Sequence, residues 1–243
     1  MPVRLHPSLA TATAAALVLL DPGAARAAVV WDGDAARGTA VFGNVECTSP
    51  GSLVPAAQQD GHGTVFRYTK AVGVYRCESR GIRVNGTRHT FAENRTYWFG
   101  WEQKFSTVPG SGSDWVPWQW KSYPNASQNY PLLMTVGAGR LQLKYVAPGE
   151  VWHTIWSAPV AAWDWNRVAI GVHTSTSASS GWVELYYNGA KQTFTDGSTR
   201  YAGRTWDSAN EPKWGAYDRG NTTTEIVNRV DSLRMGTTHT DVT

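Results

Sequence analysis

The chain has little cysteine, methionine or charge. Among its 243 residues there are two cysteines and three methionines, and 17% of the side chains are charged. The cysteines form no CxxC motif, and no HxxxH spacing accompanies them, so the sequence does not favour a metal site built on them. The formal net charge is +3 and no basic run or nucleic-acid motif is present, so we expect no nucleic-acid partner. Attraction to a polyanion would have to be local to a groove.

Helical periodicity is missing as well. Beyond the first residues, no segment of ten or more shows an apolar stripe at helical spacing. The chain instead contains thirteen tryptophans, ten tyrosines and 24 glycines, and about a dozen short strand-like runs are separated by Gly, Asn, Pro and Ser turns. No internal repeat or break in composition divides it. We predict a single all-β domain folded as a two-sheet sandwich or β-jelly roll.

The first residues have the features of an export signal. Arg4 precedes an apolar, alanine-rich run that reaches Leu20, and Ala25–Ala27 forms a small-residue cleavage site. The run is too short and too rich in alanine to indicate a membrane span. We therefore expect a signal peptide over residues 1–27, a mature domain over residues 28–243, and a secreted protein that does not associate with a membrane.

Both cysteines, Cys47 and Cys77, belong to the expected mature domain. In an exported protein such a pair indicates a disulfide, and two buried free thiols are the alternative. Closing this loop would stabilise the fold by about 3–4 kcal/mol on the chain-entropy estimate.

Two aromatic segments, Trp115–Tyr123 and Lys213–Arg219, carry the most informative residues. Side chains alternate between the two faces of a strand. One face of the first segment would carry Trp115, Pro117, Gln119, Lys121 and Tyr123, and one face of the second Lys213, Gly215, Tyr217 and Arg219. Such a surface suits an anionic sugar, because its donors bind carboxylates and its aromatic rings stack on sugar rings. The alternative is two ordinary strands with solvated polar faces.

At these residues the sequence resembles the jelly-roll polysaccharide lyases of the heparin lyase I and glucuronan lyase type. An ordered series of segments carries the resemblance: Arg76-Cys77-Glu78, YWFGWEQKF, the Gln119-Trp120 pair, PLLMTVGAGRLQL and KWGAYDRG. The series runs from about residue 65 to residue 236. The resemblance implies a concanavalin-like jelly roll whose concave sheet forms a groove for an acidic polysaccharide, which is cleaved by β-elimination without a required cofactor.

The chemistry of elimination explains these residue types independently. The reaction removes the proton at C5, next to a carboxylate, and breaks the C4–O bond. Something must neutralise the carboxylate as the transition state develops, and Gln119 and Arg76 suit that task. By the resemblance, Tyr217 is the best candidate for proton transfer. Lys213 and Arg219 flank Tyr217 and are candidate substrate-binding residues, with an ordinary solvated face as the alternative.

Arg76 also has an alternative role, because it lies on the same predicted strand face as Glu78. The two side chains would form a structural ion pair if Arg76 does not bind substrate.

The general base is the point where the sequence departs from the family pattern. Lys121 stands where heparin lyase I-like enzymes have a histidine after the Gln-Trp pair. Either Lys121 orients the carboxylate while Tyr217 serves as base and acid, or a histidine from another strand supplies the base. His89 is the first choice, because it follows the Arg76–Glu78 segment. His173 is the second and a candidate substrate-binding residue. A solvated histidine is the alternative for each.

Two aspartates near the ends of the domain, Asp34 and Asp231, are candidate oxygen ligands for a structural calcium ion. Two scattered aspartates without a shared metal are the alternative.

The preferred function is that of a secreted, monomeric lyase acting on a glucuronan or a related acidic glycan. The competing hypothesis is a non-catalytic carbohydrate-binding module or lectin on the same scaffold. A glycoside hydrolase needs two carboxylates facing the cleft, and Glu102, Glu184 and Asp218 do not pair on the Gln119 or Tyr217 faces.

Overall fold

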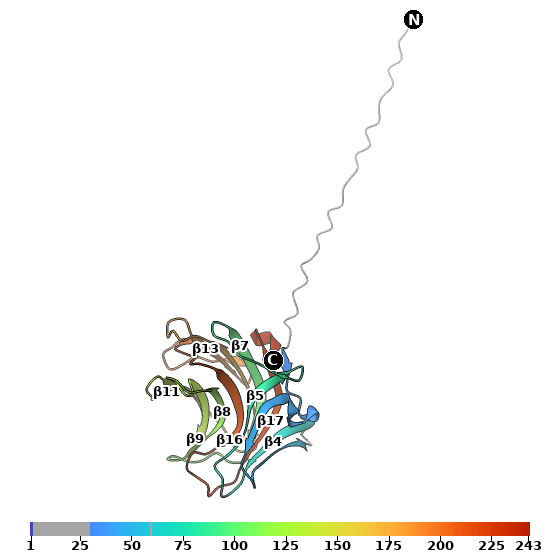
Figure 1. Ribbon diagram of the computed structural model, residues 1–243, viewed down its shortest axis with the longest axis vertical. Helices are drawn as coiled ribbons and strands as arrows, with labels where there is room; N and C mark the ends of the chain where they lie inside the picture. Colours follow the sequence, from blue (N-terminus) through green and yellow to red (C-terminus); the bar gives the residue numbers. More distant parts are fainter. Residues whose placement is uncertain (2–29, 59) are drawn as a thin grey trace.

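The computed structural model describes Met1, residues 30–58 and residues 60–243 (Figure 1). Apart from Met1, the expected signal peptide lies outside the described residues. No helix within these ranges is long and apolar enough to cross a membrane. The described helices are three short 3₁₀ turns, η1 (Ala35–Arg37), η2 (Thr39–Val41) and η3 (His239–Asp241).

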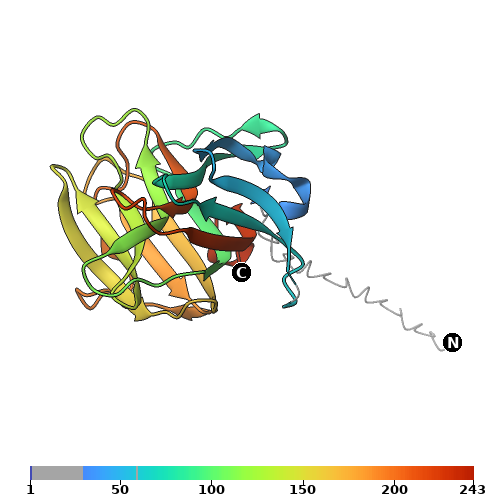
Figure 2. The same cartoon turned by 90° about the horizontal axis from the view of Figure 1, so that it is seen from below.

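Two antiparallel sheets face each other as a sandwich (Figures 1 and 2), which confirms the predicted all-β fold. The nine-stranded sheet has the order β14 (Ala190–Lys191), β13 (Trp182–Tyr187), β12 (Trp165–His173), β7 (Thr96–Phe105), β17 (Ile226–Gly236), β4 (Thr64–Lys70) and β3 (Ser52–Ala57), with β1 (Trp31–Asp32) beside β17 and β15 (Tyr201–Ala202) beside β13. The eight-stranded sheet has the order β11 (Val151–Pro159), β10 (Arg140–Ala147), β9 (Leu132–Gly137), β8 (Asp114–Ser122), β16 (Asn210–Tyr217), β5 (Arg76–Val84) and β2 (Phe42–Cys47), with β6 (Thr87–Arg88) beside β5.

Aromatic side chains from both sheets fill the space between them. Trp101 of β7 stacks on Trp118 of β8, with ring centroids 5.6 Å apart. Trp214 of β16 meets Phe99 edge-on at 6.1 Å, and Trp120 lies 5.7 Å from Phe99. These tryptophans are core residues, and their burial fixes which faces of β8 and β16 point away from the core.

A β-bulge in β8 corrects one part of the predicted alternation. Its register against β9 shifts between Trp115 and Trp118, so one extra residue lies on β8 at that point. Trp115 therefore turns into the core, where it is 1% exposed and packs edge-on against Phe105. The prediction that it shares a face with Gln119 was wrong, because strict alternation holds only without a bulge.

A second irregularity, in β16, sets the position of Tyr217. The register against β8 shifts between Trp214 and Tyr217, and Gly215 has φ 153°. A Cβ on Gly215 would lie 2.3 Å from the Cys77 carbonyl oxygen, so only glycine fits there. Ala216 is buried in the core, and Tyr217 stands opposite Arg76 of β5.

The expected disulfide is confirmed. Cys47 of β2 and Cys77 of β5 are bonded and face each other in register. The bond ties the edge strand β2 to the strand that supplies Arg76 and Glu78.

Candidate active site

Gln119 and Tyr217 meet in one cleft on the outer face of the eight-stranded sheet. The cleft has a volume of about 220 Å³ and is lined by Arg76, Glu78, Gln119, Lys121, Asn129, Tyr130, Glu150, Lys213, Tyr217 and Arg219. Gln119 is 4% exposed and Tyr217 is half-buried. The cleft therefore unites an amide from the middle of the chain with a phenol from near its end, as the sequence predicted.

Strand register explains why these side chains share a face. Lys213 of β16 stands opposite Gln119 of β8 on one side and opposite Arg80 of β5 on the other. Directly opposed residues of antiparallel strands point to the same face. Since the tryptophans between them are held in the core, the polar residues of β5, β8 and β16 emerge together on the outer surface.

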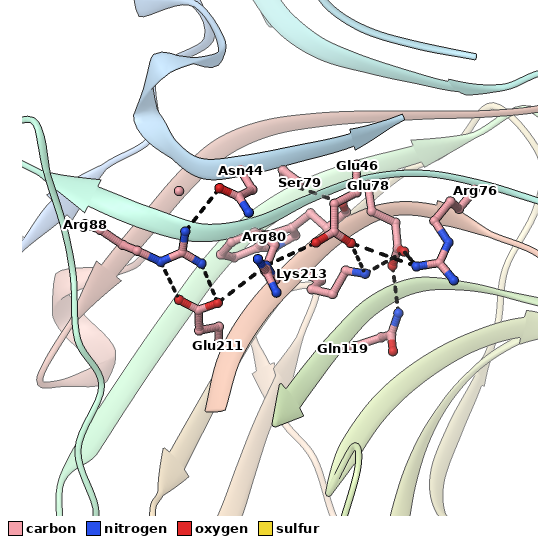
Figure 3. A network of polar contacts seen from close by, with 12 residues as sticks. Asn44, Glu46, Arg76, Glu78, Ser79, Arg80, Arg88, Gln119, Glu211 and Lys213 are labelled. Carbon is pink, nitrogen blue, oxygen red and sulfur yellow. Dashed lines mark hydrogen bonds and ion pairs between the residues drawn. The ribbon is translucent and has the colours of Figure 1, made fainter. Parts of the chain in front are cut away.

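Glu78 is the centre of the polar network at the floor of the cleft (Figure 3). The Gln119 amide nitrogen donates to Glu78 Oε1 at 2.7 Å, and Lys213 Nζ donates to Glu78 Oε2 at 2.7 Å. Lys213 also donates to Glu46 Oε2 at 2.9 Å. These bonds fix the amide of Gln119 and leave its second hydrogen for a ligand.

The structure corrects the role expected for Lys213. Its side chain is only 1% exposed and two glutamates already bind its ammonium group. Burial alone would lower the pKa of Lys213, but the charges of Glu78, Tyr123 and Glu46 and the hydrogen bond to Glu78 together raise it above the ordinary value. The charge of Lys213 in turn lowers the pKa of Glu46 against the effect of burial. Lys213 is therefore a positioning residue in the floor of the cleft, where it holds Glu46 and Glu78 and they supply the counter-charges that a buried ammonium group requires.

Arg76 is a partly exposed cation of the cleft. Its guanidinium lies 4.9 Å from the centre of the Tyr217 ring and 5.1 Å from that of Tyr75. Its Nη1 is 3.9 Å from Glu46 and 4.0 Å from Glu78, and the side chain is 32% exposed. The geometry is therefore compatible with both predicted roles of Arg76. It forms a loose ion pair with Glu46 and Glu78, and its guanidinium stays accessible to a substrate.

Lys121 lies in the cleft at the position that the family pattern gives to histidine. Burial and the nearby charge of Lys213 lower the pKa of Lys121 to about 8. Its ammonium group donates to Asn129 Oδ1 and lies 4.7 Å from the centre of the Tyr123 ring. Lys121 thus changes charge within the range of pH in which enzymes are commonly assayed.

Neither histidine considered as a base lies at Gln119. His89 lines an adjoining pocket with Arg80 and Tyr123, where its ring meets Phe91 edge-on at 4.6 Å. Burial lowers the pKa of His89. It is separated from Gln119 because it follows the end of β5, beyond the residues that face the cleft.

His173 requires a larger correction, because it belongs to the other sheet. Strand β12 pairs with β7 and β13, and His173 stacks on Trp182 with ring centroids 5.7 Å apart. Its Nδ1 is 3.0 Å from Thr96 Oγ1. His173 therefore does not contribute to substrate binding in the Gln119 cleft.

Arg219 lies at the mouth of the cleft, exposed to solvent just beyond the end of β16. This position agrees with its predicted flanking of Tyr217.

Sequence reasoning missed Glu46, although a signal for it existed. Once Cys47 is paired with Cys77 on antiparallel strands, Glu46 must stand opposite Glu78, as the structure shows. Glu46 also forms an ion pair with Arg80, whose Nε lies 3.1 Å from Glu46 Oε1.

The sequence also missed the loop residues Asn129, Tyr130 and Glu150. No pattern within a strand marks them, since loops bring them to the cleft.

The network continues along the sheet beyond Arg80. Arg88 Nη2 donates to Glu211 Oε2 at 2.7 Å, and Arg80 Nε lies 3.6 Å from the same oxygen (Figure 3). Alternating cations and carboxylates thus connect the cleft with the pocket of His89, so the two hollows share one charged floor.

The two aspartates considered for calcium have different surroundings. Asp34 Oδ1 accepts a hydrogen bond from the Ala36 backbone at 2.8 Å and caps η1. Asp231 lies with His62 and Glu102, whose potential ligand atoms are within 4.8 Å of one another. An imidazole differs from the oxygen ligands that calcium prefers, and Glu102 is already bound by Arg167. The residues therefore do not form an evident calcium site, and calcium binding stays a prediction.

Comparison with solved structures supports the fold. The alginate lyase AlgAT5 of polysaccharide lyase family 7 superposes with a TM-score of 0.55 at 17% identity, covering 78% of this chain and 83% of that one. An alginate lyase from Corynebacterium sp. gives 0.53 at 17% identity, covering 78% and 82%. The alginate lyase AlyA1 from Zobellia galactanivorans gives 0.51 at 12% identity, covering 82% and 96%. At these identities the likeness shows a shared jelly-roll sandwich.

The sequence itself identifies the family. No curated protein matches the chain. Residues 35–233 match the polysaccharide lyase family, a span that includes the strands of the cleft. Membership supports a lyase activity and implies a polysaccharide substrate. The chain belongs to the polysaccharide lyase family.

Proposed function

We propose that the protein is a secreted, monomeric lyase that cleaves a glucuronan or a related uronate polysaccharide by β-elimination in the Gln119–Tyr217 cleft. The observation that carries this proposal is the convergence of Gln119, Arg76 and Tyr217 in one cleft. The sequence resemblance to the heparin lyase I and glucuronan lyase type favours a uronate substrate, and family membership favours a lyase over a lectin.

The first task of the site is to hold the substrate carboxylate. Glu78 fixes the Gln119 amide, whose free hydrogen can donate to a carboxylate oxygen. Arg76 and the protonated form of Lys121 supply positive charge from the same cleft. As negative charge spreads from C5 into the carboxylate, these fixed donors stabilise the transition state more than the ground state.

The second task is proton transfer, which we assign to Tyr217. In D-glucuronate the C5 hydrogen and the C4 oxygen lie on the same side of the ring, so one phenol can reach both. The phenolate removes the C5 proton, the C4–O bond breaks, and the phenol returns the proton to the departing oxygen. The products are a 4,5-unsaturated uronate and a new hydroxyl end. The guanidinium of Arg76, packed over the Tyr217 ring, keeps the ring in place.

Secretion is supported by the signal-like N-terminus and by the Cys47–Cys77 disulfide, since such bonds persist in oxidising compartments.

The test is incubation of the folded, disulfide-bonded protein with polyglucuronate, polymannuronate, polyguluronate and heparin, while the ultraviolet absorbance of the unsaturated product is followed. We expect absorbance to rise with at least one polyuronate, and Tyr217→Phe to lower kcat by about 10³-fold or more, since it removes the proton carrier. Tyr75→Phe is the matched control, because this tyrosine packs beside Tyr217 without lining the cleft.

The competing function predicts a different result. A carbohydrate-binding module or lectin would retain a polysaccharide without forming product, and Tyr217→Phe would leave its binding unchanged. Absence of product from every uronate polymer would reject the lyase assignment.

A further inference from the structure

We propose that the outer face of the nine-stranded sheet carries a second binding site for a uronate polymer, formed by Arg67, Arg229 and Trp163. This back-face site lies on the opposite side of the sandwich from the cleft, where β17 runs between β4 and β7 (Figure 1). The choice of a uronate polymer as its ligand rests on the proposed function.

A row of like charges crosses three adjacent strands at this point. Arg229 of β17 stands directly opposite Arg67 of β4 and directly opposite Lys104 of β7. Directly opposed residues have Cβ atoms about 5 Å apart, and like charges in such pairs destabilise a sheet. Among the described residues, Lys104 alone of the three forms an ion pair with a carboxylate, that of Asp60. The row therefore has an excess of positive charge.

Arg229 has guanidinium donors that no described residue satisfies. Its Nε and Nη1 are shielded from water and have no hydrogen-bond partner among the described residues. Burial and the charge of Arg67 lower the pKa of Arg229. The carboxylate of Asp60 acts in the opposite direction, but its ion pair is with Lys104 and not with Arg229. An anion bound beside Arg67 and Arg229 would therefore relieve their repulsion.

Trp163 places an aromatic surface beside these cations. Its ring lies 4.8 Å from Cζ of Arg229 and the residue is 52% exposed. Its φ of 67° is rare for a bulky residue and costs free energy. A 2.7 Å hydrogen bond from its backbone nitrogen to the Phe105 carbonyl holds it there. Strained backbone of this kind clusters at ligand sites. Here it keeps an indole half exposed beside two arginines that form no ion pair with any described residue.

The combination fits an acidic sugar polymer. The exposed Arg67 offers donors to carboxylates, Arg229 adds positive charge beside it, and the indole offers an apolar plane to a sugar ring. A polymer held here would stay near the enzyme between cleavages in the opposite face.

Affinity electrophoresis in native gels containing polyglucuronate, or whichever polyuronate the protein cleaves, tests the proposal. A Tyr217→Phe background prevents cleavage of the gel polymer. We expect this protein to be retarded, and Arg67→Ser or Trp163→Ala to weaken the apparent affinity about fivefold or more. Arg200→Ser is the matched control, because it removes the same charge from an exposed arginine already paired with Glu184. It should change the affinity less than twofold.

The outcomes separate this site from the proposed function. Retardation that depends on Arg67 and Trp163 while no polyuronate is cleaved would support the site and reject the lyase assignment. If a polyuronate is cleaved but the protein is not retarded, or is retarded equally with and without either substitution, the back-face site is wrong and the lyase assignment stands. Equal or stronger retardation by single-stranded DNA would also overturn it, because the ligand would then be any polyanion. In protein with Tyr217 intact, Arg67→Ser should leave cleavage of a short oligouronate within twofold of wild type.

Discussion

The two outer faces of the sandwich differ in whether nearby carboxylates compensate their positive charges. On the cleft face, the buried ammonium of Lys213 is bound by Glu46 and Glu78 at 2.9 and 2.7 Å. On the back face, Arg67 and Arg229 oppose each other, and neither forms an ion pair within the part of the chain described here. Compensated charges hold side chains in fixed positions, as catalysis requires. Charges without a nearby carboxylate can instead be stabilised by an anionic ligand, which favours binding.

The largest expected effect tests the compensated face. Lys213→Met should lower the free energy of unfolding by about 3–5 kcal/mol, because it leaves the carboxylates of Glu78 and Glu46 beside each other without their cation. Denaturant unfolding at neutral pH measures the change. The paired substitution Arg67→Ser should cost no stability. If both variants unfold at the wild-type midpoint, the claim that the two faces differ in charge compensation is wrong.

The sequence predicted which side chains of β8 face the cleft better than it predicted the hydrogen bonds and ion pairs among them. Alternation correctly placed Gln119 and Lys121 on one face, since β8 is regular after its bulge. It failed at Trp115, because a bulge arises from packing between strands and has no signature in the sequence of one strand.

Histidine shows a different limit. His89 was considered because it follows the strand that carries Arg76, but nearness in sequence does not determine which hollow a side chain lines. Glu46 was predictable in principle, because the Cys47–Cys77 bond fixes the register that brings it to Glu78. Predicting that Glu46 and Glu78 bind Lys213 would have required the order of strands β2, β5 and β16 in the sheet, which a single sequence does not reveal.

Charge within the cleft is expected to depend on pH through Lys121. The pKa of about 8 means that its ammonium is present below this pH and is lost as the pH rises above it. If that charge holds the substrate carboxylate, KM should be constant below about pH 8 and increase up to about tenfold by pH 9. Lys121→Arg keeps its charge and should give a constant KM over this range. The alternative, that neutral Lys121 is the base, predicts instead that kcat rises through pH 8 and that Lys121→Arg is inactive.

Two tryptophans with similar exposure allow a matched test of the two faces. Trp152 is 45% exposed and packs against Tyr130 of the cleft with ring centroids 5.4 Å apart, whereas Trp163 is 52% exposed on the back face. Trp152→Ala should raise KM for oligouronates roughly 5- to 10-fold, which corresponds to about 1–1.4 kcal/mol of lost stacking. Trp163→Ala should leave this KM unchanged. Equal effects of the two substitutions on short substrates would show that the faces do not act separately.

The smallest expected effect is a gain in stability on the back face. Arg67→Ser removes one member of a like-charged, directly opposed pair, so it should raise the free energy of unfolding by about 0.2–1 kcal/mol at low salt. The gain should shrink toward zero near 1 M salt, where the screening length falls to about 3 Å. Arg200→Ser breaks an ion pair with Glu184 and should give no gain at any salt concentration. If Arg67→Ser raises the free energy of unfolding and also weakens polymer binding, Arg67 contributes to ligand binding at a cost in stability. A destabilised, salt-independent Arg67→Ser variant would instead show that Arg67 supports the sheet by packing.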